Sequence, residues 1–154
     1  MGLQPPSEAW HPERVQNLSE QTLAAIGRMT VAATDLDYLL AWIGADRAGG
    51  DATAVFARPG EPLVAARGSV EFAAAPNREE LILGVEAAGR QLAVSQAVLR
   101  RLWSADTRAD AAVFDDIAAQ LLRCREWLHT FVAAHVGNPS PTAEAGQGTR
   151  ATPA

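Results

Sequence analysis

Hydrophobic residues recur at helical spacing through most of the chain, and the alternation typical of strands is absent. From about Leu18 to Ala45, apolar side chains return every three or four residues, so they share one side of a helix. Further stretches with this spacing begin near Pro62, Asn77 and Asp110. The apolar stripes are Ile26, Met29, Ala33, Leu36, Leu40 and Ile43; Leu63, Ala66, Val70 and Ala73; Leu81, Val85, Ala88, Leu92, Ser95, Leu99 and Leu102; and Phe114, Ile117, Leu121, Cys124, Leu128, Phe131 and His135. The pattern predicts an all-α fold, a four- to five-helix up-and-down bundle with disordered termini.

Short polar residues mark the predicted helix starts, because their side chains can accept hydrogen bonds from the free N–H groups of a first turn. Ser19 or Asn17 fits this role before the first helix, Asn77 before the third and Asp110 before the last. Between the first two long elements, residues 51–57 predict a short helix anchored by its aromatic residue. The second long element can begin at its proline, whose missing N–H costs nothing in a first turn.

Length and composition predict three segments in one domain. The 154 residues suffice for a single core. Residues 1–16 contain several prolines and are expected to be extended, residues 17–137 to form the bundle, and residues 138–154, rich in Pro, Gly, Ser, Thr and Ala, to be disordered. The start lacks the apolar core of a signal peptide, and no apolar run approaches the roughly 20 residues that span a bilayer. The single cysteine cannot form a disulfide within the chain, which fits a reducing compartment. We therefore expect a soluble, cytoplasmic protein without a membrane partner.

The charge of the chain bears on which partners it can bind. The formal net charge of −5 argues against general nucleic-acid binding, which needs clustered cations. Arg90, Arg100, Arg101 and Trp103 lie near the end of the third predicted helix and could contact a phosphate or a protein partner. They could equally be solvated cations that suit a helix C-terminus.

The stretch "LLRCREWLHT" on the last predicted helix is the main candidate for chemistry. Arg125 and His129 are four residues apart and share a helix face, whereas Arg123 points about 120° away from His129. One interpretation is a pair that flanks the apolar seam and covers its edge. The other is an RNase site, in which an arginine holds the scissile phosphate and the histidine moves a proton during attack by the 2′-hydroxyl, without a metal.

Two resemblances to HEPN domains bear on that alternative. Active bacterial HEPN domains are dimeric helical bundles with an Arg followed four to six residues later by a His. Arg123 and His129 have a similar spacing, which is the first resemblance. The region 23–135 also resembles a group of uncharacterised helical proteins of actinobacteria with a HEPN-like Arg-Asn-x-x-Val-His-x-x-Trp pattern. That pattern falls on "SQAVLRRLW", where Leu99 and Trp103 match. Its Arg, Asn and His positions hold Ser95, Gln96 and Arg100, so the catalytic Arg and His are both missing. The second resemblance implies a HEPN-like fold without the chemistry.

These observations support three hypotheses about function. The preferred one is a non-enzymatic interaction or regulatory module, homodimeric through the first or last helix, with an exposed patch that includes Trp42, Trp103 or Trp127. The second is the metal-independent RNase. The third is a small-molecule-binding bundle with a cavity near small residues, namely Ala33, Ala88 and Ser95. We expect no metal and no cofactor, because His129 and His135 lack the i, i+4 spacing of a helical zinc pair and no phosphate-binding loop is present.

Overall fold

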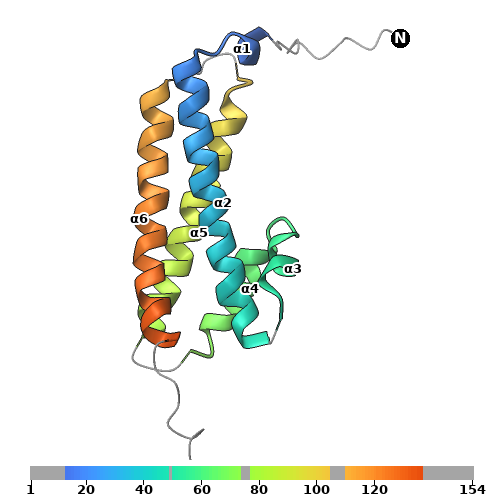
Figure 1. Ribbon diagram of the computed structural model, residues 1–154, viewed down its shortest axis with the longest axis vertical. Helices are drawn as coiled ribbons and strands as arrows, with labels where there is room; N and C mark the ends of the chain where they lie inside the picture. Colours follow the sequence, from blue (N-terminus) through green and yellow to red (C-terminus); the bar gives the residue numbers. More distant parts are fainter. Residues whose placement is uncertain (1–12, 49, 74–76, 105–109, 137–154) are drawn as a thin grey trace, which may run out of the picture.

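The computed structural model describes residues 13–48, 50–73, 77–104 and 110–136 (Figure 1). They form one helical turn, α1, and five further helices, with no strand in these ranges. The helices are α1 (Glu13–Gln16), α2 (Glu20–Ala48), α3 (Ala52–Phe56), α4 (Glu61–Val70), α5 (Arg78–Arg101) and α6 (Ala111–Val136). The predicted all-α class is therefore confirmed. Residues 13–16 form a helical turn instead of the expected extended segment, and residues 1–12 and 138–154 lie outside the described residues.

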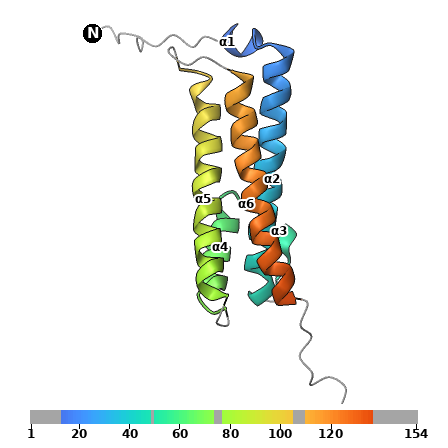
Figure 2. The ribbon, with the colours of Figure 1, turned by 90° about the vertical axis from the view of Figure 1, so that its left-hand side faces the viewer.

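Three long helices alternate in direction and run the full length of the bundle. In Figure 1, α2 descends from its N-terminus at the top, α5 rises beside it, and α6 descends again. Figure 2, turned by a quarter, shows the same three helices side by side over their whole length. This arrangement matches the predicted up-and-down order. It follows from their apolar stripes, each of which must be buried against the other two.

The fourth helix of the bundle, α4, is short and covers only one end (Figure 2). It packs against α2 at Gly44, where a Cβ atom would lie 2.5 Å from the Cβ of Ala65. It packs against α5 at Gly89, where a Cβ would lie 3.0 Å from Cδ2 of Leu63. The missing side chains let α4 approach both long helices closely. The bundle is thus four helices thick at the end where α5 begins and three helices thick where α6 begins.

The predicted caps are observed at two of three positions. Ser19 Oγ accepts a hydrogen bond of 3.1 Å from the N–H of Thr22, and Asp110 Oδ1 accepts one of 3.1 Å from the N–H of Ala112. Asn77 occupies the N-cap position of α5, but its side chain makes no capping hydrogen bond, so that part of the prediction is wrong. Pro62 lies in the first turn of α4 as predicted, after Gly60, whose positive φ of 80° suits a residue without a side chain.

The core contains most of the predicted stripe residues. Leu36, Leu40, Val85, Leu121 and Leu128 are fully buried between α2, α5 and α6. Further members are Ala25, Met29, Ala32, Leu39, Ile43, Ala66, Val70, Leu81, Ala88, Phe114, Ile117 and Ala118. Phe131 and Cys124 pack against this core partly exposed. The side chain of His135, placed last in the α6 stripe, is outside the described side chains.

Two exposed ion pairs join neighbouring helices. Arg28 of α2 donates hydrogen bonds of 2.9 and 3.1 Å to Asp115 of α6, and Arg67 of α4 donates bonds of 2.7 and 3.0 Å to Glu86 of α5. These hydrogen bonds lower the pKa values of both carboxyl groups. A carboxyl group with a lowered folded pKa stabilises the fold above its unfolded pKa and loses that contribution as pH falls, so acid weakens both links. Their exposure keeps each contribution small.

Candidate functional site

The candidate stretch on α6 is held to α2 by an ion pair. Nε of Arg125 lies 2.8 Å from Oδ2 of Asp35, and both side chains are partly exposed. The contact is electrostatic and not a straight hydrogen bond, since this buried N–H has no acceptor in line with it among the described residues. The Arg125 guanidinium is thus already neutralised by a carboxylate within the same molecule. A phosphate would have to displace that carboxylate to be bound there.

The other two residues of the candidate stretch lie on the surface. Arg123 and His129 are both exposed on α6. At 100° per residue they point about 120° apart, so within one molecule they do not face a common point. The geometry fits the interpretation of Arg125 and His129 as residues that border the apolar seam.

Replacing His129 with alanine is expected to change the free energy of unfolding by less than about 0.5 kcal/mol, because the imidazole is exposed. Urea unfolding followed by circular dichroism measures this. The same pair of proteins, incubated with single-stranded RNA in EDTA, tests the RNase alternative. RNA cleavage by the wild-type chain that disappears in the His129→Ala variant would make the stretch catalytic. A loss of several kcal/mol of stability would place the imidazole in a bonded, buried site instead.

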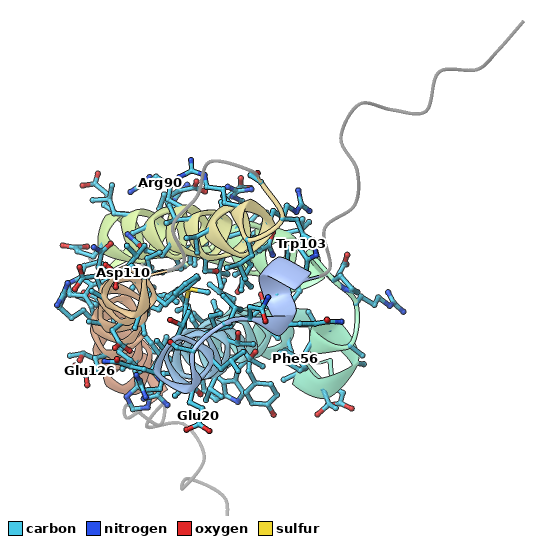
Figure 3. All side chains as sticks on the ribbon, turned by 90° about the horizontal axis from the view of Figure 1, so that it is seen from above. Glu20, Phe56, Arg90, Trp103, Asp110 and Glu126 are labelled. Atoms are coloured by element: carbon cyan, nitrogen blue, oxygen red, sulfur yellow. The ribbon has the colours of Figure 1, made fainter. Side chains whose placement is uncertain are left out.

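The cationic residues of α5 do not form one cluster. Arg90 and Arg101 share a face but are separated by about 16 Å at 1.5 Å per residue, and Arg100 lies 100° further round the helix. Figure 3 looks along the bundle and shows Arg90 and Trp103 on different sides of α5. Only Arg100, Arg101 and Trp103 share one end of the bundle. Their position in the last turn and just beyond it fits solvated cations at a helix C-terminus.

The small residues suggested for a ligand cavity are engaged in helix packing. Ala88 and Ser95 are buried, and Ala33 packs against the core. Ser95 Oγ donates a hydrogen bond of 2.8 Å to the carbonyl of Leu92. The hydroxyl thus bonds within its own helix, to the carbonyl three residues back. Burial also raises the pKa of the Cys124 thiol, so this cysteine is a packing residue and a poor nucleophile.

The outward side of α2 carries a largely apolar surface, of which the sequence indicated only Trp42. We define this α2 outer face by seven exposed residues: Leu23, Gly27, Thr30, Val31, Thr34, Tyr38 and Trp42. They span about 120° of the helix circumference on the side opposite the core. Arg28 and Asp35 lie at its edge toward α6 and are paired with that helix. The half-buried Asp37 borders the opposite edge, where burial raises the pKa of its carboxyl group. Plotting the charges around the helix would have indicated this face, whereas the apolar stripe indicates only the buried one.

Polar groups on the α2 outer face are satisfied within the helix. The hydroxyl of Thr30 donates a hydrogen bond of 2.8 Å to the carbonyl of Ile26, and that of Thr34 donates one of 2.7 Å to the carbonyl of Thr30. Both threonines therefore offer mainly their methyl groups to a partner. At the α3 end, Tyr38 packs edge-to-face on Phe56 with ring centroids 5.3 Å apart. A shallow hollow lies along Thr30, Val31, Thr34, Asp35, Tyr38 and Phe56.

Four large residues of the α2 outer face are exposed. Val31 is 70% exposed, Leu23 50%, Tyr38 43% and Trp42 37%. Of the other two tryptophans considered, Trp127 lies against Gly84 of α5 and packs at a tilt on Phe131, with ring centroids 4.6 Å apart. Trp103 lies two residues beyond the end of α5. Of the three, Trp42 is the one that belongs to the α2 outer face.

Other signals of function are few within the described residues. No group of three or more His, Cys, Asp or Glu side chains there could hold a metal ion, and none of the helices described is both long and apolar enough to cross a membrane. Comparison of the chain with protein-family models, curated proteins and solved structures finds no match in any of the three.

Proposed function

We propose that this chain is a non-catalytic helical interaction module whose binding surface is the α2 outer face. The observation that carries the proposal is the arrangement of this face, where four large exposed side chains lie in one row with small uncharged residues between them. Together they present an apolar patch on the order of 500 Å², the size of the largest patch on a typical monomer, which is often functional.

The outward faces of the other two long helices differ in character. On the outer side of α5, the exposed Leu83 and Val94 are interspersed with Glu79, Arg90 and Arg101. The outer side of α6 carries Asp116, Arg123 and Glu126. Figure 3 shows Arg90 and Glu126 pointing away from the bundle on these two sides. Charges distributed in this way keep a helix face solvated. None of the seven residues of the α2 outer face is charged, and the nearest carboxylates, Asp35 and Asp37, lie at its two edges. This favours a surface that is covered when the module is bound.

Site-specific photo-cross-linking tests the proposal. A photoreactive amino acid in place of Val31 is expected to give a discrete cross-linked protein product in cells that express the chain. The matched control is the same amino acid in place of Val64, which is 61% exposed on α4 and lies off the α2 outer face. A product from position 31 and none from position 64 supports the proposal, whether the product contains this chain twice or a different protein. Equal labelling at both positions, or none at position 31, contradicts it.

A further inference from the structure

The arrangement of residues on the α2 outer face points to the partner: we propose that it is a second copy of this chain, packed antiparallel along α2. This inference rests on the proposed function, since it names the occupant of the same surface. Leu23 and Tyr38 lie at equal distances from the point between Thr30 and Val31, about 22 Å from each other along the helix. Gly27 and Thr34 lie inside them, again at equal distances. The row from Leu23 to Tyr38 therefore has nearly the same sequence of large and small residues in both directions, and Trp42 lies beyond this symmetric part.

A two-fold axis through this central point gives complementary contacts. Gly27 then faces Thr34 of the second copy, and Leu23 faces Tyr38 of the second copy. The two small residues let the helices approach closely at the centre, while the large residues close both ends. Such an isologous contact uses one patch twice, as the commonest homodimers do.

Charge and area both agree with self-association. Each chain has a formal net charge of −5, so two copies repel each other unless they meet on an uncharged surface. The seven residues of the α2 outer face are uncharged, and the pairing places Asp35 and Asp37, at its edges, opposite Ile26 and Ala24 of the second copy. Two faces of about 500 Å² bury roughly 1,000 Å² in total, which is where specific interfaces begin. Phe56, packed on Tyr38 at the end of the row, extends the contact.

Gly27 allows the dimer to be disrupted without damage to the fold. A Cβ on this residue would have no neighbour within 4 Å, so the monomer has room for a larger side chain. Gly68 on α4 is equally free and serves as the matched control. We expect Gly27→Gln to raise the dimer dissociation constant about 100-fold, because a two-fold interface contains the added side chain twice. Gly68→Gln should leave the dissociation constant unchanged.

Sedimentation equilibrium of the full chain and both variants, over a range of concentrations, measures the effect, and circular dichroism checks that each is folded. A dimeric wild type and Gly68→Gln with a monomeric, helical Gly27→Gln are the expected results. A wild type that stays monomeric overturns this inference, and the proposed function still stands if position 31 cross-links to a different protein. If the wild type and both variants are all dimeric, the inference is also overturned, because the dimer must then use another surface.

Cysteine cross-linking tests the orientation without relying on Gly27. In a Cys124→Ala background, Leu23→Cys and Tyr38→Cys chains are mixed and oxidised. An antiparallel dimer gives mainly the mixed disulfide, since disulfide formation needs Cβ atoms about 3.5–4.5 Å apart. A parallel dimer would instead link each variant to itself, and that result would exclude the proposed arrangement.

Discussion

Replacing Leu128 with alanine is expected to lower the free energy of unfolding by about 2–5 kcal/mol. The side chain is fully buried on α6, and its Cδ2 atom packs closely against Gly84 of α5. Truncation removes its buried methyl groups and leaves a cavity that three long helices cannot readily collapse into. Urea unfolding with the slope compared between variants measures the loss.

The matched control for this variant is Leu122→Ala on the same helix. Leu122 is 47% exposed, so its truncation is expected to cost well under half as much as that of Leu128. Similar losses for the two variants would mean that the seam of α6 is rotated relative to the described packing.

Replacing Gly44 with alanine is expected to destabilise the chain by about 1–3 kcal/mol, although alanine is the better helix former. The added Cβ would lie 2.8 Å from the carbonyl carbon of Ala65 and 3.0 Å from the backbone nitrogen of Ala66. Backbone atoms of α4 cannot rotate away as a side chain tip can. The helix must therefore move as a whole, which also disturbs the packing of Ala66 and Val70 in the core. Thermal and urea unfolding measure the change.

The matched control is Gly68→Ala, which is expected to raise the free energy of unfolding, whereas Gly44→Ala lowers it. Nothing lies within 4 Å of a Cβ at this position in α4, so the variant should gain about 0.5–1 kcal/mol from helix propensity alone. A stabilising Gly44→Ala would show that α4 does not lie against α2 as described.

Helix positions were predictable from the sequence because burial imposes a period on the chain. Leu36, Val85 and Leu121 each belong to a stripe of apolar residues that repeats every three or four positions along its helix, and all three are buried. The length of α4 was harder to predict, because its stripe from Leu63 to Ala73 is as regular as the others. The close contacts at Gly44 and Gly89 depend on how three helices meet, and a residue's own sequence neighbours do not encode them.

The candidate site shows the opposite balance. The sequence draws attention to Arg125 and His129 because they carry chemistry, but the partner of Arg125 is Asp35, 90 positions away on another helix. Conversely, the residues around Val31 are chemically plain and attract no notice one at a time. They become distinctive only when the fold shows that their side faces outward and that Arg28 and Asp35, at one edge, are already paired with α6.

Because α4 covers only one end of the bundle, the two ends differ in how readily they open locally. Where α4 is present, Leu40, Val85 and Ala66 are enclosed by four helices, and their amides can exchange with solvent only through openings close to global unfolding. At the opposite end, around Thr22 and Phe114, three helices and the single turn α1 share the burial. Smaller fluctuations suffice there, so the bundle frays from the end at which α6 begins and keeps a protected nucleus around α4.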